Sequence, residues 1–189
     1  MGDFLRLSIV ADTPLPASAW VERWLAPVQS NETLLDWACG SGRNSQLALT
    51  RGYRVTALDR NADSLARLSA AIERQQIDLE QAPWPPLKSF DVVLVCNYLY
   101  RQRLDLLAGL VKPGGLLLYE TFAAGNERFG KPSNPEYLLK RGELIDLARR
   151  QQMNILAYED IEVVTPKPAC IQRIAARRNY LATDLATAS

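Results

Sequence analysis

The stretch that most constrains the fold is LLDWACGSGRNSQLALTRGYRVTALD, residues 34–59. Two apolar runs, 33–39 and 54–59, have the composition of buried strands. Between them lies a turn that contains Gly40 and Gly42, followed by a short helical pattern that ends at a glycine. A strand, a helix and a second strand in this order form a βαβ unit with parallel strands. The sequence therefore predicts a parallel sheet covered by helices.

The same alternation continues along the chain. The run 90–100 is almost entirely apolar, as expected for a central strand buried on both faces. Two late strands are joined by too few residues for a crossover helix, so they should form an antiparallel hairpin. The predicted strands are 33–39, 54–59, 77–80, 90–100, 114–122, 153–164 and 169–180, and the predicted helices are 18–28, 44–52, 62–76, 101–111 and 136–151.

The predicted fold class is α/β: a Rossmann-like, doubly wound sheet of five parallel strands plus a C-terminal antiparallel hairpin, with helices on both faces. A length of 189 residues suits a single domain. We expect an N-terminal helical cover at 1–32, a cofactor-binding core at 33–123, and a substrate loop, helix and hairpin at 124–189. The last residues, 181–189, are expected to fray.

Composition excludes several kinds of function. The net charge is +1, so nothing in the overall charge favours a nucleic-acid or membrane surface. The sequence shows no signal-peptide pattern or membrane-spanning run, which predicts a cytoplasmic protein. The three cysteines, Cys39, Cys96 and Cys170, are widely spaced and odd in number, which argues against a disulfide framework and a metal site. Histidine is absent, so histidine-based hydrolytic triads and most zinc sites are excluded, and no metal is predicted.

The glycine turn indicates a ligand. Gly40 and Gly42 lie where a strand leads into a helix, so backbone can approach a ligand closely and the free N–H groups of the helix can meet an anion. A dinucleotide fingerprint would have a third small residue at Ser45, where serine is tolerable. A nicotinamide dinucleotide and S-adenosylmethionine both suit this unit, and a plain tight connection is the alternative.

Two aspartates bear on the choice between a bound cofactor and a plain tight connection. Asp59 ends the second strand, 19 positions after Gly40, near the spacing at which an acid binds ribose hydroxyls. Its alternative role is a helix N-cap, which Asn61 or Asp63 would supply equally well. Asp36 lies inside an apolar strand, where a carboxylate is costly unless it has a positive or donating partner. The backbone amides of the glycine loop are an alternative partner for it, and both roles can hold together.

A family resemblance follows from these segments. LLDWACGSGRNS, VTALDRN, IDLE, FDVVLVCNYL and LVKPGGLLLYETF occur in the order and spacing of the class I S-adenosylmethionine-dependent methyltransferases, over residues 33–123. More narrowly, the chain resembles the small tellurite-resistance-type methyltransferases. The loop ETFAAGNERFGKPSNP is similar to that of uncharacterised bacterial members. The cofactor implied is S-adenosyl-L-methionine, with S-adenosyl-L-homocysteine as product.

The resemblance also implies roles for individual residues. Asp59 would bind the ribose hydroxyls and Arg60 would border the adenine. Asp78 would accept from the adenine amino group, while the backbone of Leu79 reads the ring edge. The wall against the methionine part would consist of Asp36, near its ammonium group, with Ala38, Gly40 and Gly42. The fourth strand would end beneath the sulfonium and methyl with Cys96, Asn97 and Tyr98. The first helix would cover the cofactor, although a core-facing position of Trp20 and Trp24 is favoured.

The catalytic and acceptor-binding residues are less constrained, because methyl transfer depends chiefly on proximity and orientation. Asn97, Tyr98 and Glu120 are the catalytic candidates, with Tyr100 and Thr121 as further polar groups at strand ends; ordinary solvent-facing positions are the alternative. The loop after Thr121 is the predicted substrate-binding segment, through Asn126, Glu127 and Arg128, with Lys131 and Asn134 nearby. These polar groups would otherwise only order the loop.

Three functions compete. The favoured one is a methyltransferase, monomeric or homodimeric, that acts on a small molecule and binds neither membrane nor nucleic acid. A protein or RNA methyltransferase is the second, and its basic patch would consist of Arg149, Arg150, Arg173, Arg177 and Arg178. The third is a module that binds S-adenosylmethionine without catalysis. The sequence does not identify the methyl acceptor.

Overall fold

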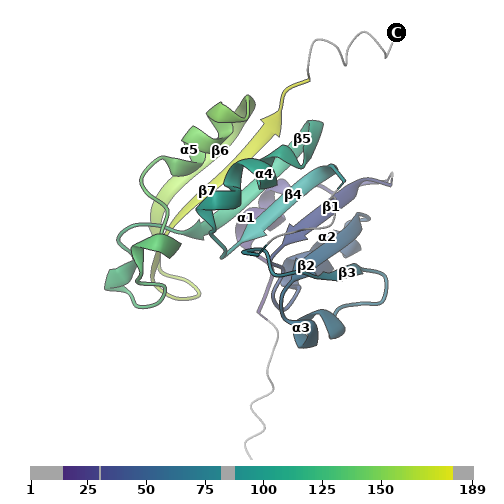
Figure 1. Cartoon of the computed structure of the whole chain (residues 1–189), viewed down its shortest axis with the longest axis horizontal. Coiled ribbons are helices and arrows are strands. Elements are labelled where there is room, and N and C mark those ends of the chain that lie inside the picture. Colours follow the sequence, from purple (N-terminus) through teal and green to yellow (C-terminus); the bar gives the residue numbers. More distant parts are fainter. Residues whose placement is uncertain (1–14, 30, 82–87, 181–189) are drawn as a thin grey trace, which may run out of the picture.

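The computed structural model describes residues 15–29, 31–81 and 88–180, which form a seven-stranded sheet flanked by helices (Figure 1). The strand order is β3-β2-β1-β4-β5-β7-β6. The strands are β1 (Thr33–Trp37), β2 (Arg54–Asp59), β3 (Glu73–Gln76), β4 (Phe90–Cys96), β5 (Val111–Phe122), β6 (Met153–Val163) and β7 (Ala169–Arg178). The α-helices are α1 (Ala19–Trp24), α2 (Arg43–Thr50), α3 (Ala62–Ala66), α4 (Leu104–Gly109) and α5 (Glu143–Arg150), and the 3-10 helices are η1 (Arg101–Arg103), η2 (Asn126–Arg128) and η3 (Pro135–Tyr137).

The predicted sheet topology is confirmed. β3, β2, β1, β4 and β5 pair in parallel, while β7 pairs antiparallel with both β5 and β6. β1 and β4 lie at the centre because their side chains are apolar on both faces. The carboxyl ends of the five parallel strands consequently meet at one edge of the sheet, where ligands bind in open α/β folds.

Helices cover both faces, as predicted. On one face α1, α2 and α3 pack through Trp20, Ala48 and Leu65 onto alternate strand residues such as Leu34. On the other face α4 and α5 pack onto the residues between them, such as Leu35. Trp20 is buried in this core and its ring lies 5.7 Å from that of Trp24. The core-facing interpretation of the tryptophans is confirmed for Trp20.

The region between β2 and β4 differs from the prediction. The helix expected over 62–76 ends at Ala66, and the third strand occupies Glu73–Gln76 instead of 77–80. Leu65, Leu68 and Ile72 are all buried, so their spacing does mark core positions, but the last two follow the helix in turns. An edge strand needs little apolar side-chain surface, and the polar strand Glu73–Gln76 therefore has no hydrophobic signal.

Two other elements are also shorter than predicted. β4 stops at Cys96 because Asn97 has left-handed backbone, with φ 57°. The helix expected over 136–151 is α5 alone, preceded by η3 and by Gly142, whose φ of 76° interrupts the pattern. The predicted fraying of 181–189, the proline-rich loop at 82–87 and the first part of the N-terminal cover lie outside the described residues.

Candidate functional site

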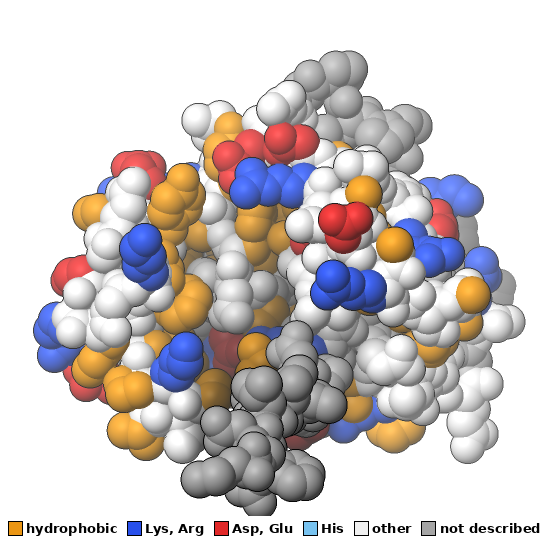
Figure 2. All heavy atoms as spheres, turned by 90° about the horizontal axis from the view of Figure 1, so that it is seen from below, with side chains coloured by type: hydrophobic (Ala, Val, Ile, Leu, Met, Phe, Trp, Pro, Cys, Tyr) orange, Lys and Arg blue, Asp and Glu red, His pale blue; other side chains and the backbone are white. Residues whose placement is uncertain are grey.

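The glycine turn lies at the carboxyl end of β1. Figure 2 shows the molecule from below the view of Figure 1, with a hollow near the middle of this face. Gly40 and Gly42 have φ values of 54° and 73°, which favour glycine. A Cβ at Gly42 would lie 2.0 Å from Leu68 Cδ2. The absence of a side chain at Gly42 therefore allows Leu68 to pack directly against the turn. Among the residues that the structure describes, none has an atom within 4 Å of a Cβ placed at Gly40. With respect to the described part of the chain, Gly40 therefore leaves open space beside the turn.

Asp59 joins the end of β2 to this turn. Its Oδ2 accepts from the N–H of Gly40 at 2.8 Å, and its Oδ1 accepts from the N–H of Asn61 at 2.9 Å. The N-cap of α3 is Asn61, whose Oδ1 accepts from the N–H of Ser64. Asp59 is thus not the helix cap, and its half-exposed carboxylate lies beside the open space at Gly40.

Asp36 is buried beneath the turn, with 1% of its surface exposed. Its Oδ2 accepts from the Ser45 hydroxyl at 2.6 Å, and the start of α2 contributes a further backbone hydrogen bond from Ser45. Burial raises the pKa of Asp36 to about 6, against the opposing effects of the Ser45 hydrogen bonds and Arg43. The sequence predicted a positive or donating partner for Asp36, and the structure shows that this partner is Ser45 in the first turn of α2.

Ala38 and Asn97 follow β1 and β4, and both have φ of 57° in the left-handed region. Such backbone is uncommon for residues other than glycine, and asparagine tolerates it better than alanine. Ala38 also packs onto the core next to Trp37. Asn97 is exposed at the carboxyl edge, and its N–H donates to the carbonyl of Glu120 at 2.9 Å.

Asp78 and Leu79 lie in the turn that follows β3, at the same edge. Asp78 Oδ1 accepts from the N–H of Glu80 at 3.0 Å, and the side chain of Leu79 is buried. Tyr98, after β4, has a buried hydroxyl with no hydrogen-bond partner among the described residues. Burial raises the pKa of that phenol, as do Glu80 and Asp78, while the nearby Arg60 lowers it. The structure thus brings the predicted adenine-side residues together at one end of the sheet.

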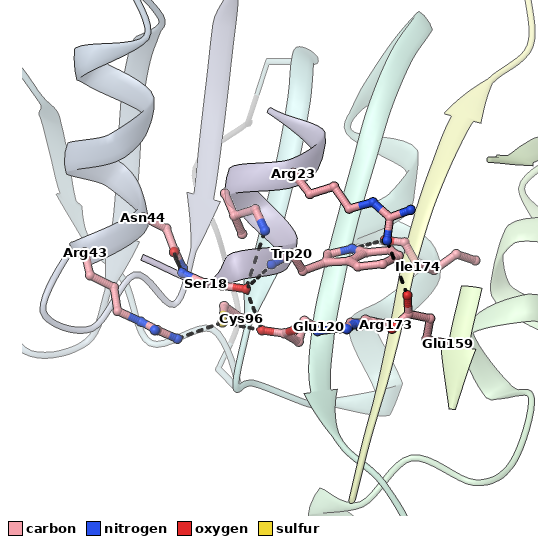
Figure 3. Close-up of polar contacts among 11 residues, drawn as sticks. Ser18, Trp20, Arg23, Arg43, Asn44, Cys96, Glu120, Glu159, Arg173 and Ile174 are labelled. Atoms are coloured by element: carbon pink, nitrogen blue, oxygen red, sulfur yellow. Dashed lines mark hydrogen bonds and ion pairs between the residues drawn. The ribbon is translucent and has the colours of Figure 1, made fainter. Parts of the chain in front are cut away.

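A polar cluster lies where β4 and β5 end (Figure 3). The Ser18 hydroxyl donates to Glu120 Oε1 at 2.7 Å, and Cys96 Sγ lies 3.7 Å from the same oxygen. Arg43 donates through Nη2 to Cys96 Sγ at 3.2 Å and through Nη1 to the carbonyl of Pro16 at 2.8 Å. Burial, together with Glu120, raises the pKa of Cys96 to about 12, so its thiol stays protonated at neutral pH.

The cluster continues toward the hairpin. Arg173 Nη1 lies 3.3 Å from Glu120 Oε2, and its Nε donates to Glu159 Oε2 at 2.7 Å. The same guanidinium lies over the ring of Trp20, 4.9 Å from its centroid, as Figure 3 shows. Only 12% of the Glu120 side chain is exposed. Glu120 is therefore held by an ion pair and two hydrogen bonds, and its catalytic role stays a prediction.

Sequence reasoning missed Arg43, Ser18 and Asn44, although Asn44 Oδ1 accepts the N–H of Ser18 at 2.9 Å and joins two of these segments. Arg43 could have been found from the sequence, because it directly follows the glycine turn and is the first residue of α2. Ser18 has only the signal of an N-cap, a function it performs for α1. Its second partner, Glu120, is 102 residues away in sequence.

The predicted substrate loop is tied to the hairpin. Asn126 is buried, and its amide bonds the carbonyl of Pro132 and the N–H of Cys170 at 2.9 and 3.2 Å. Arg128 pairs with Glu162 and donates to Cys170 Sγ at 3.4 Å. Glu127 is exposed and accepts the N–H of Gly125, and Asn134 caps η3. These contacts order the loop, and acceptor binding by it stays a prediction.

The arginines considered as an RNA-binding patch all have partners within the protein. Arg149 and Arg150 pair with Asp146 and Asp105, at 3.7 and 3.2 Å. Arg177 and Arg178 donate to backbone carbonyls of the segment that includes Gly114. These contacts involve part of each guanidinium, and a role of the arginines in RNA binding stays a prediction.

Metal-binding groups, membrane-spanning helices and cavities can be assessed for residues 15–29, 31–81 and 88–180. In this part of the chain no three or more Cys, Asp or Glu side chains are grouped to hold a metal ion, and no helix is long and apolar enough to cross a bilayer. A cavity of about 470 Å³ lies at the amino ends of the strands, lined by residues such as Thr33, Arg54 and Phe90. It is at the opposite end of the sheet from the predicted site residues.

Comparison with known proteins identifies the family. Residues 11–165 match the family described as "Methyltransferase domain". The chain is 38% identical over 103 residues to malonyl-[acyl-carrier protein] O-methyltransferase of Serratia marcescens, covering 50% of this chain and 40% of that one. It is 33% identical over 111 residues to ribosomal protein L11 methyltransferase of Shewanella pealeana, covering 54% and 38%. The chain thus spans about two fifths of the length of these curated relatives.

Solved structures agree on the fold. TehB of Haemophilus influenzae superposes with a TM-score of 0.68 at 21% identity, over 84% of this chain and 61% of that one. An S-adenosylmethionine-dependent methyltransferase of Mesorhizobium loti gives 0.65 at 16% identity, over 84% and 95%. The resemblance to the class I S-adenosylmethionine-dependent methyltransferases is confirmed at the level of fold, and TehB of Haemophilus influenzae is among the structures with this fold. The chain therefore belongs to the methyltransferase-domain family and has the class I S-adenosylmethionine-dependent methyltransferase fold.

Proposed function

We propose that this protein transfers a methyl group from S-adenosyl-L-methionine to a small-molecule acceptor. The observation that carries the cofactor assignment is the junction of β1 and β2: Gly40 leaves open space, and Asp59 lies beside it with its carboxylate half-exposed. A carboxylate accepts hydrogen bonds from both hydroxyls of a ribose. The same junction would also suit a nicotinamide ribose, but the family match favours the methyl donor.

The residues present fit S-adenosylmethionine along the whole edge. Gly40 and Ala38 would border its methionine part, Asp59 the ribose, and the turn with Asp78 and Leu79 the adenine. Asp36 is buried under the turn, so its charge would act on the ammonium through the loop instead of by direct contact. When bound, S-adenosylmethionine supplies an activated methyl that a nucleophile displaces from sulfur in line.

The acceptor site would lie at the ends of β4 and β5, next to Asn97. Here Cys96, Glu120 and Arg43 are partly or largely enclosed, with Ser18 packed onto Glu120. A polar cluster that is partly buried in this way favours a small acceptor over a folded macromolecule. Neither Cys96, whose thiol is protonated, nor Glu120, which is ion-paired, is poised as a strong base. We therefore expect an acceptor that is nucleophilic without deprotonation by the protein, such as a thiolate, carboxylate or oxyanion.

A macromolecular acceptor is the second candidate. One relative is named for ribosomal protein L11 and another for malonyl-[acyl-carrier protein]. Both are much longer than the part this chain matches, so their acceptors do not transfer directly. A cofactor-binding module without catalysis is the third candidate.

The cofactor assignment is tested by calorimetric titration with S-adenosylmethionine and with NAD. We expect binding of the former, and preference for NAD would contradict the assignment. Asp59→Ala should weaken binding by about 1–3 kcal/mol, because a charge-assisted hydrogen bond to the ribose is lost. Asp63→Ala, which removes an exposed carboxylate in the first turn of α3, is the matched control and should leave affinity unchanged.

The acceptor assignment is tested with radiolabelled S-adenosylmethionine. One arm contains small thiols, carboxylates, amines and inorganic oxyanions including tellurite, and the other contains purified ribosomal proteins and acyl-carrier protein. Label transferred only in the first arm supports the small-molecule proposal, and label in the protein arm supports the second candidate. Tight binding without transfer in either arm supports the non-catalytic module.

A further inference from the structure

The guanidinium of Arg101 has the densest set of contacts near the acceptor end. Arg101 begins η1, five residues after β4 ends. Its Nε and Nη2 donate to the two carboxylate oxygens of Glu143, at 2.7 and 3.0 Å. Nη2 also donates to the carbonyl of Leu138 at 2.6 Å, and Nη1 donates to that of Glu136 at 2.8 Å. A planar guanidinium suits this arrangement, because its fork matches a carboxylate and leaves further donors for carbonyls.

The carbonyls that Arg101 holds belong to the segment 134–142, which closes the loop after β5. The N–H of Leu139 donates to the carbonyl of Phe122 at 2.9 Å, so this segment continues along the end of β5. Gln172 of β7 donates to the carbonyl of Lys140 at 2.8 Å from the other side. The segment is therefore held to β5 by a backbone hydrogen bond and to β7 by the side chain of Gln172. Arg101 holds it to the chain that follows β4.

Its place is close to the proposed chemistry. The chain that leaves β4 begins with Asn97 and carries Arg101, and β5 reaches the segment just after Glu120. The carboxylate of Glu143 also accepts the N–H of Lys140 at 2.8 Å, which fixes the turn into α5. Only 25% of the Arg101 side chain and 16% of the Glu143 side chain are exposed. This cluster is accordingly partly shielded from water, and it links the chain that leaves β4 to the segment that pairs with the end of β5.

We propose that Arg101 is a positioning residue for the acceptor site: by fastening the segment 134–142 to the end of β4, it sets the wall against which the methyl acceptor is held. This rests on the proposed function, since the wall matters for catalysis only if transfer occurs at the ends of β4 and β5. The cofactor half of the site, at β1 and β2, does not depend on this cluster. Arg101 therefore governs acceptor recognition without governing cofactor affinity.

The test compares the wild-type protein with Arg101→Gln, Arg101→Lys and the charge swap R101E/E143R. The matched control is Arg150→Gln, which removes another ion pair to an acidic residue, between α5 and Asp105, without touching the segment. Hydrogen exchange is followed on peptides covering 135–141, calorimetry measures S-adenosylhomocysteine affinity, and rates are measured with the acceptor found in the screen above.

In Arg101→Gln we expect the amides of 135–141 to exchange at least tenfold faster, while S-adenosylhomocysteine affinity stays within twofold. The KM for the acceptor should rise at least fivefold, with the KM for S-adenosylmethionine unchanged. Arg101→Lys and the charge swap should remain loosened, because neither restores the carbonyl contacts, and Arg150→Gln should match the wild type.

Unchanged exchange in Arg101→Gln overturns the proposal, as does full recovery in the charge swap, which would reduce the cluster to a plain ion pair. A loosened segment with an unchanged acceptor KM overturns it too. Failure of the wild-type protein to bind S-adenosylhomocysteine would instead refute the proposed function, while the exchange comparison still decides whether Arg101 holds the segment.

Discussion

Asp36 provides the sharpest test, because its burial makes a signed prediction about stability and pH. The carboxyl lies under the glycine turn, and burial raises its pKa from 3.8 to about 6. A raised carboxyl pKa means that the folded state binds the proton more tightly than the unfolded state. The free energy of unfolding should therefore fall as pH rises from about 4 to about 6. At about 1.4 kcal/mol for each pKa unit, the ionised Asp36 costs about 3 kcal/mol at pH 7.

Asp36→Asn removes this cost. The amide oxygen can still accept from the Ser45 hydroxyl, which lies 2.6 Å from the native carboxylate. The new NH₂ group lacks an evident acceptor, and leaving it unsatisfied costs about 1–3 kcal/mol. We expect a net gain of about 1 kcal/mol in the ligand-free protein at pH 7.5, and a net loss at pH 4.5, where the native carboxyl is protonated.

Urea denaturation at several pH values between 4.5 and 7.5 measures both differences. Asp91→Asn is the opposite control: burial is outweighed by hydrogen bonds from Lys112 and Thr33, which lower the pKa of Asp91. A carboxyl with a lowered pKa contributes stability above its unfolded pKa and loses it as pH falls, so the Asp91→Asn deficit should shrink toward low pH. A pH-independent difference between Asp36→Asn and the wild type would refute the reasoning.

Three further predictions concern strained or buried positions. Ala38→Gly should raise the free energy of unfolding by about 1 kcal/mol in urea titrations, because alanine at φ 57° is strained; a loss would show that its methyl packing dominates. Asn97→Ala should be about 1 kcal/mol less stable than Asn97→Gly, for the same reason, and equal stabilities would contradict it. Asn126→Ala should lower stability by about 1–3 kcal/mol, since the buried N–H of Cys170 loses its acceptor. Glu127→Ala, at an exposed neighbour, should change thermal or urea stability by less than about 0.5 kcal/mol.

Local sequence patterns predicted the strands correctly where a strand is buried on both faces, or where the connection is too short for anything but a hairpin. The apolar runs predicted β1 and β4, and the short connection after β6 predicted the hairpin with β7. The same reasoning failed at β3, because its four residues are polar and lie at the edge of the sheet. There the spacing of Leu65, Leu68 and Ile72 resembles a helix although only Leu65 lies within one.

The contacts of the candidate site can also be divided into those between residues close in sequence and those between distant segments. Gly40 and Asp59 are 19 residues apart within one βαβ unit, so the spacing predicted that both lie at one end of the sheet, and the structure adds the hydrogen bond between them. The partners of Glu120 could not be predicted in this way, because Ser18 and Arg173 come from segments 102 and 53 residues away.

The sequence by itself predicted the topology of the sheet and the place of the glycine turn, and the family resemblance that it carries indicates S-adenosylmethionine as the cofactor. These depend on periodicity and on short separations, which leave a record in neighbouring residues. Only the tertiary structure decided that Asp36 faces the first turn of α2, that Glu120 is held by Arg173, and that Arg101 fastens the loop after β5. Such contacts depend on which segments the fold places side by side. The neighbours in sequence of a polar residue do not indicate which distant residue it will contact.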